Sequence, residues 1–292
     1  MDQNSQTGNR IKILVIVGPT ASGKSALAWK LAQEYNGELI SADSRQVYRG
    51  LDIGTGKEKF LQHLIDVADP SEDYNVSHFV RDAKKAIEDI VRRGKLPIVV
   101  GGSGFWIDSL VFGHDLPEVS PRGNLRAELE KKTWQELFEQ FEKLDPERAK
   151  HIDRHNKRRL IRALEVAMVT GKAVKPLLSG STAQYDALWI GIKVPKEELD
   201  HKIEKRLNAW FDAGLIEETK KLPNAERFGL AYTAIAKYLK GELDEAEMRV
   251  QALQSIKQYA KRQMTWFKRN KVIRWIAFGN QVEKLVEDFL YL

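Results

Sequence analysis

An eight-residue segment near the amino end constrains the fold of this chain more than any other feature. It fits the pattern G-x-x-x-x-G-K-[ST] and consists of Gly18, Pro19, Thr20, Ala21, Ser22, Gly23, Lys24 and Ser25. Residues 11–17 before it are mostly β-branched or otherwise apolar, which is typical of a buried parallel strand. Apolar residues after it keep helical spacing to about Tyr35. A strand, a glycine-rich loop and a helix in this order predict a site where backbone N–H groups bind phosphate.

Two side chains of this loop are expected to act on the phosphate directly. Lys24 would add a positive charge at the terminal phosphate, and Ser25 would hold a Mg²⁺ ion. The glycines let the backbone approach an anion without a clash from Cβ. A glycine-rich turn that contains Lys-Ser by chance is the structural alternative. The motif indicates a di- or triphosphate ligand but leaves the chemistry open, because kinases, NTPases and other transferases share it.

Strands and helices alternate along the first part of the chain. Residues 77–93 predict a helix with one apolar stripe, whose first turn Ser77 can cap. The predicted strands span residues 11–17, 38–42, 96–100 and 188–194, with a short one allowed at 272–276. Helices separate the first three strands, so the sheet should be parallel with right-handed crossovers. We therefore expect an α/β fold with a P-loop NTPase-like parallel sheet.

The character of the sequence changes near Gly113. Residues 114–124 contain Pro117, Pro121 and Gly123, which suits a linker, and the chain from 125 to about 169 looks almost wholly helical and highly charged. We therefore expect an inserted all-helical domain. The expected boundaries are 115–180 for the insert, and 1–114 with 181–292 for the α/β core and its C-terminal helices.

One acidic residue stands at the expected carboxyl end of the second strand. Asp43 follows residues 38–42, and ligands of open α/β sheets bind at the carboxyl ends of strands. A carboxylate at this place can act as a general base or as a metal ligand. Alternatively, Asp43 or Ser44 caps a helical turn at residues 46–48. Its position by itself leaves both interpretations open.

Composition excludes some functions and favours others. The 292 residues include no cysteine, which excludes disulfides, thiolate zinc sites and cysteine nucleophiles. The net charge of +6 decides little, but cations cluster at 157–162 and 261–274, the second cluster among aromatic residues. Such stretches suit RNA phosphates and unstacked bases, although a solvated charged face beside core aromatics is the commoner origin. No segment resembles a signal peptide or a membrane span, so we expect a cytoplasmic protein without a membrane partner.

Several motifs together resemble those of the tRNA dimethylallyltransferase family, also called tRNA isopentenyltransferases. The matching segments follow the family's order over nearly the whole chain. They are residues 18–25, 41–57, 63–66, 69–70, 100–105, 158–165, 170–172, 214–218 and 258–267.

The resemblance implies a reaction. The family moves a dimethylallyl group from dimethylallyl diphosphate to N6 of the adenosine on the 3′ side of the anticodon, in tRNAs that read codons beginning with U. The phosphate loop would bind the diphosphate of the donor, with Mg²⁺ on Ser25 to neutralise the leaving group. By position, Asp43 matches the family's general base and Thr20 the residue that contacts the bridging oxygen. The target base would be flipped out of its stack.

The resemblance also implies contacts with a tRNA anticodon stem-loop. Asp43, Ser44, Arg45 and Gln46 match the stretch that reads the flipped base. Further tRNA-binding candidates are Ser103, Arg126, Arg158, Arg159, Leu160, Ile161 and Arg162. Arg227 is the candidate for the earlier of the family's two diphosphate-binding cations, whereas Thr233 stands where the family commonly has Lys or Arg and supplies no charge. One tRNA held between core and insert suggests a monomer.

Three other functions compete with this one. An adenylate isopentenyltransferase would prenylate a free nucleotide, but such a substrate needs no helical insert with arginines. A small-molecule kinase with a P-loop would transfer phosphate from ATP and ignore RNA. A non-catalytic RNA-binding module is disfavoured, because Asp43 stands beside an intact phosphate loop.

Overall fold

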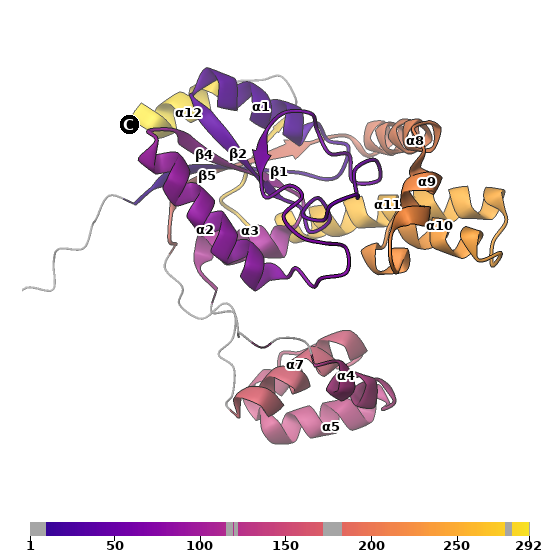
Figure 1. Cartoon of the computed structure of the whole chain (residues 1–292). Coiled ribbons are helices and arrows are strands. Elements are labelled where there is room, and N and C mark those ends of the chain that lie inside the picture. Colours follow the sequence, from indigo (N-terminus) through magenta and orange to yellow (C-terminus); the bar gives the residue numbers. More distant parts are fainter. Residues whose placement is uncertain (1–9, 115–118, 120–121, 172–182, 278–281, 292) are drawn as a thin grey trace, which may run out of the picture. The chain divides into compact units, whose positions relative to one another are not determined.

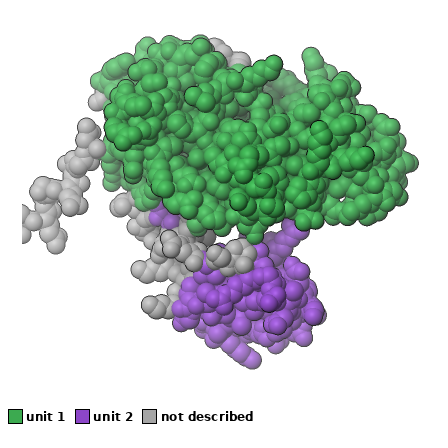
Figure 2. Space-filling model, viewed as in Figure 1, with its two compact units in different colours: residues 1–112, 183–292 green, residues 113–182 purple. Residues whose placement is uncertain are grey.

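The computed structural model describes residues 10–114, 119, 122–171, 183–277 and 282–291. The chain divides into two compact units (Figure 2). The larger comprises residues 1–112 and 183–292, and the smaller comprises residues 113–182. Within the described residues, no helix combines the length and the apolar character needed to cross a bilayer.

A six-stranded sheet forms the centre of the larger unit (Figure 1). All of its strand pairs are parallel, in the order β3-β2-β4-β1-β5-β6. The strands are β1 (Lys12–Val17), β2 (Gly37–Ala42), β3 (Gln62–His63), β4 (Leu96–Gly101), β5 (Asp186–Lys193) and β6 (Arg274–Ala277). This sheet confirms the predicted α/β class, and β3 is an additional strand that the sequence analysis did not predict.

Helices cover both faces of the sheet. The helices of the larger unit are α1 (Lys24–Glu34), α2 (Val76–Arg92), α3 (Gly104–Phe112), α8 (Lys196–Asp212), α9 (Leu215–Lys221), α10 (Ala231–Leu239), α11 (Glu245–Phe267) and α12 (Val282–Tyr291), with a 3₁₀ turn at Ala225–Phe228. Alternate residues of β1 belong to two separate cores: Ile13 and Val15 pack with α2, α3 and α8–α11, whereas Leu14 and Ile16 pack with α1 and α12. Burial on both faces explains why the β1 sequence is almost continuously apolar.

The carboxyl ends of β2, β4 and β1 lie level with one another. Gly101 of β4 pairs in register with Val17 on one side and with Ala42 on the other. A Cβ atom on Gly101 would lie 2.1 Å from the carbonyl oxygen of Ala42, so only glycine allows this close approach. As a result, the phosphate loop after Val17 and Asp43 after Ala42 start from the same edge of the sheet.

The smaller unit is helical and has its own core. Its helices are α4 (Gly123–Glu130), α5 (Trp134–Leu144), α6 (Pro146–Ala149) and α7 (Lys157–Thr170). Leu137, Phe141, Leu160 and Leu164 are fully buried between these helices. This packing gives the unit a hydrophobic core independent of the sheet.

Candidate functional site

The loop between β1 and α1 is shaped to receive an anion. Gly23 caps α1 with a left-handed backbone (φ 89°), and Lys24 begins the helix. The hydroxyl of Ser22 is buried and has no hydrogen-bond partner among the described residues. A cavity of about 300 Å³ opens beside the loop, lined by Ala21, Gly23, Lys24, Ser25, Ala26, Glu58, Lys202 and Arg206. An unsatisfied buried hydroxyl and a helix amino terminus are features that a bound phosphate would complete.

Two cations meet in this cavity. Burial, and secondly the neighbouring charge of Arg206, lower the pKa of Lys24 to about 8. Burial likewise lowers the pKa of Arg206 to about 10. The carboxylates of Asp43 and Glu58 act in the opposite direction on both groups. The cavity therefore concentrates positive charge with little solvent, and an anionic ligand would relieve the repulsion.

Arg206 reaches the phosphate loop from α8 and was not among the residues predicted from the sequence. Its guanidinium donates a hydrogen bond to the hydroxyl of Thr20 and lies over the ring of Trp210, with Cζ 4.6 Å from the ring centroid. Arg206 and Trp210 are four residues apart on α8, a spacing that indicates a cation–π contact on one helical face. This spacing does not reveal which loop α8 packs against.

The structure places Arg227 in a different pocket. Its guanidinium forms an ion pair with Asp73 at 3.0 Å and lies over the rings of Tyr48 and Phe228. That pocket is lined by Ser44, Arg45, Tyr48, Asp73, Arg227 and Phe228. No contact of the described residues joins Arg227 to the phosphate loop, so Arg206 is the better candidate for a diphosphate-binding cation beside Lys24.

Asp43 caps the turn that follows β2 with one of its two carboxylate oxygens. Its Oδ1 accepts hydrogen bonds from the backbone N–H groups of Arg45 (2.9 Å) and Gln46 (3.4 Å), which is the geometry of a cap. Among the described residues, no hydrogen bond to Oδ2 is formed. Ser103 supports the same turn, because its hydroxyl accepts from the N–H of Ser44 at 3.0 Å. Capping by one oxygen therefore orients the carboxylate and leaves the other oxygen free to accept a proton.

A glutamine of α11 joins the phosphate loop to the end of β4. Gln263 is buried; its Oε1 accepts from the N–H of Thr20 at 2.8 Å, and its Nε2 donates to the carbonyl of Gly102 at 3.1 Å. A Cβ on Gly102 would collide with this amide at 1.9 Å. Gln263 was not among the site residues predicted from the sequence, although a polar residue on the buried face of a helix is a signal for a specific hydrogen-bonding role.

In the smaller unit, two of the predicted tRNA-binding arginines are bound to a buried acid. Arg126 and Arg162 both donate to the carboxylate of Glu165, which is fully buried and also accepts from the N–H of Arg122. Burial by itself would raise the pKa of Glu165, but the bonds from Arg126, Arg122 and Arg162 outweigh it and hold that pKa below its usual value.

The remaining candidates of the smaller unit divide by exposure. Arg158 and Arg159 are exposed on α7, whereas Leu160 and Ile161 are buried in the core of the unit. Buried side chains such as these two cannot touch RNA unless the unit rearranges, so their role here is to anchor the helix that carries the exposed arginines.

Comparison with known proteins points to one family. Its model, described as IPP transferase, matches residues 46–270, and a second model, described as isopentenyl transferase, matches residues 11–64. A "tRNA dimethylallyltransferase 1" of Citrifermentans bemidjiense is 42% identical over 289 residues, covering 92% of this chain and 93% of that protein. A "tRNA dimethylallyltransferase" of Anoxybacillus flavithermus is 36% identical over 296 residues, covering 96% and 95%.

Solved structures show the same similarity. A tRNA isopentenylpyrophosphate transferase from Bacillus halodurans has a TM-score of 0.68 at 33% identity, covering 95% of this chain and 93% of that one. A eukaryotic dimethylallyltransferase, described as acting on tRNA, has a TM-score of 0.76 at 26% identity, covering 95% and 78%.

Proposed function

Because this chain belongs to the IPP transferase family, we propose that it transfers a dimethylallyl group from dimethylallyl diphosphate to tRNA. The acceptor is N6 of the adenosine on the 3′ side of the anticodon in tRNAs that read codons starting with U, and the product is N6-dimethylallyladenosine. One observation carries the proposal beyond family membership: Lys24, Arg206 and Asp43 bring two cations and a carboxylate together at the phosphate loop. A prenyl transfer to an amine needs an anion site for the leaving diphosphate and a base for the amine proton.

The phosphate loop and its two cations form the donor site in this proposal. The backbone N–H groups at the start of α1 and the side chains of Lys24 and Arg206 bind the diphosphate. The hydroxyl of Thr20, held by Arg206, faces the bridging oxygen of the donor. These groups take up the negative charge that grows on the diphosphate as its bond to carbon breaks.

Mg²⁺ fits this site as a proposed cofactor. Ser25 lines the cavity, and magnesium usually takes few protein ligands beside phosphate oxygens and water. No cluster of three acidic or histidine side chains suited to a metal occurs among the described residues, which is consistent with an ion held mainly by its substrate. When bound, the ion would add positive charge at the leaving diphosphate.

The chemical step uses Asp43 as the base. N6 of the flipped adenine attacks C1 of the dimethylallyl group, the bond from C1 to the bridging oxygen breaks, and diphosphate leaves. The proton lost from N6 passes to the free Oδ2 of Asp43. Because Oδ1 is fixed by the N–H groups of Arg45 and Gln46, the carboxylate needs no reorientation for this transfer.

The two units would share the tRNA. Ser44, Arg45, Gln46 and Ser103 lie at the turn that Asp43 caps, and we propose that they contact the flipped adenine. Arg158 and Arg159 present exposed cations suited to RNA phosphates, and Glu165 holds Arg126 and Arg162 in fixed positions nearby on the same unit. We further propose that the protein works as a monomer in the cytoplasm, where its tRNA substrate is found.

One assay tests the proposed function. The protein is incubated with labelled dimethylallyl diphosphate, Mg²⁺ and unmodified tRNA, with AMP replacing tRNA in a parallel reaction. Label in tRNA supports the proposal. Label in AMP and not in tRNA would replace it with an adenylate isopentenyltransferase, and label in neither would reject prenyl transfer altogether.

A further inference from the structure

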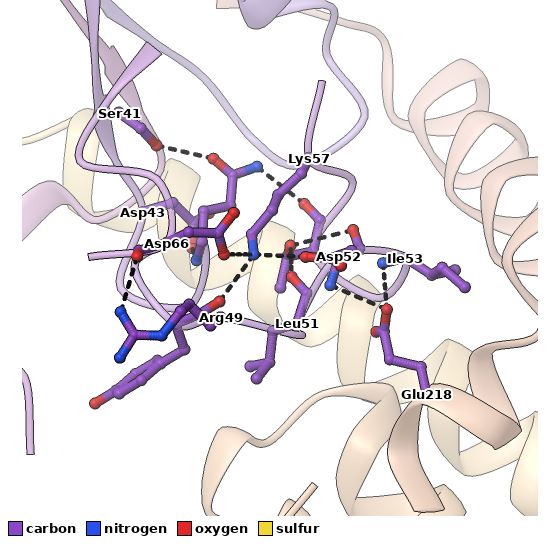
Figure 3. Close-up of polar contacts among 12 residues, drawn as sticks. Ser41, Asp43, Arg49, Leu51, Asp52, Ile53, Lys57, Asp66 and Glu218 are labelled. Carbon is purple, nitrogen blue, oxygen red and sulfur yellow. Dashed lines mark hydrogen bonds and ion pairs between the residues drawn. The ribbon is translucent and has the colours of Figure 1, made fainter. Parts of the chain in front are cut away.

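Glu218 of α9 binds a turn that lies far from it in the sequence (Figure 3). Its Oε2 accepts from the N–H groups of Asp52 (3.0 Å) and Ile53 (2.7 Å), and its Oε1 accepts from the N–H of Gly54 (3.1 Å). The hydroxyl of Tyr232 also donates to Oε1, at 2.7 Å. Three successive amides that converge on one point form a local site for an anion, and the carboxylate fills it.

This close approach depends on a glycine. A Cβ atom on Gly54 would lie 2.6 Å from the hydroxyl of Tyr232 and 2.8 Å from the side chain of Leu215. Tyr232 and Leu215 are both fully buried, so neither can move aside easily. The close packing of α9 against the turn at residues 52–54 is therefore part of the buried core and not a surface contact.

The other end of the turn is also fixed. Lys57 has a side chain that is only 8% exposed, and its Nζ pairs with the carboxylates of Asp52 and Asp66 and donates to the carbonyl of Tyr48. Figure 3 shows these bonds meeting at the lysine ammonium group. Glu218 therefore fixes the start of the segment 52–57 and Lys57 fixes its end, so the backbone between them has little freedom.

The carbonyls between these two points hold the side chain of Gln46. Its Nε2 donates to the carbonyls of Thr55 (3.1 Å) and Gly56 (3.4 Å), and its Oε1 accepts from the hydroxyl of Ser41 (2.8 Å). These partners fix which way the amide points, because its nitrogen donates to two carbonyls and its oxygen accepts from a hydroxyl and keeps one free lone pair. Gln46 also belongs to the turn that Asp43 caps.

We infer that Glu218 is a positioning residue that acts on the acceptor base through Gln46. The carboxylate orders the turn at residues 52–54, the turn presents the carbonyls of Thr55 and Gly56, and these orient the Gln46 amide beside Asp43. The inference rests on the proposed function, in which Gln46 contacts the flipped adenosine. In this arrangement α9 influences how the flipped adenine is recognised, although no residue of α9 contacts that base itself.

The first test measures the Gln46 amide without any reaction. Protein labelled with ¹⁵N-glutamine gives a side-chain amide signal for Gln46, which Gln46→Ala identifies by its loss. Glu218→Gln should shift and broaden this signal, because an amide cannot accept three backbone N–H bonds. The matched control Glu217→Gln, on an exposed neighbour in α9, should leave it unchanged. An unchanged signal in Glu218→Gln would overturn the inference, even if the protein proved inactive on tRNA.

The second test is a double-mutant cycle on tRNA prenylation. We expect Glu218→Gln to lower kcat/KM for tRNA by tenfold or more, with KM for dimethylallyl diphosphate within twofold of the wild type. In a Gln46→Ala background the same change should cost less than twofold. An equal loss in both backgrounds would mean that Glu218 acts on stability in general and would overturn the inference.

A milder variant covers the case in which Glu218→Gln does not fold. Tyr232→Phe keeps the shape of the side chain and removes one of the hydrogen bonds to Glu218. We expect a loss of about threefold in kcat/KM for tRNA in the otherwise wild-type protein. In the Gln46→Ala background, Tyr232→Phe should leave kcat/KM for tRNA unchanged. A threefold loss in that background as well would contradict the inference.

Discussion

Arg206 and Thr20 are 186 residues apart in the sequence, yet the guanidinium of the first donates a hydrogen bond to the hydroxyl of the second. The bond links α8 to the phosphate loop and places a second cation beside Lys24. A cation at this position binds an anion more tightly if it is already held against the loop before the anion arrives. The stacking of Arg206 on Trp210 serves that purpose.

The first prediction concerns this arginine. Arg206→Met should raise KM for dimethylallyl diphosphate by about 10- to 100-fold, since a hydrogen bond to a charged group contributes about 1.5–3 kcal/mol. Affinity for tRNA should stay the same. Steady-state kinetics and a tRNA binding assay measure the two effects, with Lys205→Met on the exposed side of the same helix as control. Equal KM values for Arg206→Met and the control would exclude Arg206 from the donor site.

The second prediction is a pH dependence. Lys24 binds the diphosphate as an ammonium ion, and its pKa in the free protein is lowered to about 8. Above pH 8 the ammonium form is lost, so kcat/KM for the donor should fall by up to tenfold per pH unit. At saturating donor, kcat should change much less, because the bound diphosphate stabilises the charged form. Lys24→Arg should move the fall to higher pH, and an unchanged profile in that variant would assign it to another group.

The third prediction concerns stability and Asp108. Burial raises the pKa of Asp108 to about 6, against the opposing effect of a hydrogen bond from Trp266. The folded state therefore binds a proton more tightly than the unfolded state, and the free energy of unfolding should fall as pH rises from 5 to 7. The partly exposed carboxylate should contribute about 1 kcal/mol to this fall. Asp108→Asn should remove that share in denaturant unfolding at the two pH values, and an equal slope in both proteins would refute the assignment.

The fourth prediction separates two arginines of α7. Arg159→Ala should weaken tRNA binding and reduce the salt slope of log K by about 0.7–0.9, with no change in stability, because its side chain is exposed. Arg162→Ala should also lower the free energy of unfolding, by about 1–2 kcal/mol, because buried Glu165 loses a partner. Filter binding at several salt concentrations and thermal unfolding test the pair. Identical stability losses would contradict the distinction between them.

The sequence predicts the sheet best where a strand is apolar on both faces. Residues 11–17 and 96–100 became β1 and β4, because burial on both faces leaves an almost continuous apolar run. The two residues of β3 carry no such run. At the start of α2, Ser77 was the wrong cap: Asn75 accepts from the N–H groups of Ser77 and His78. Both side chain types can cap, so the backbone geometry decides between them.

The site residues divide in a similar way. The phosphate loop and Asp43 could be found because each follows directly from a strand end. Arg206, Gln263 and Glu218 could not, because each reaches the site from a helix whose packing partner is not encoded in its local pattern. The same limit applies to Arg126 and Arg162: both were predicted to bind tRNA, and only the fold shows that the buried carboxylate of Glu165 binds both of them.

The central claim is that Asp43 takes the proton from the acceptor amine, and Asp43→Asn tests it most directly. Asparagine keeps an oxygen that can accept from Arg45 and Gln46, so the turn should persist while the base is lost. Single-turnover prenylation of tRNA, with both substrates saturating, should slow by about 10²- to 10⁴-fold, with unchanged dissociation constants for tRNA and for dimethylallyl diphosphate. A rate per bound complex equal to that of the wild type would contradict the account.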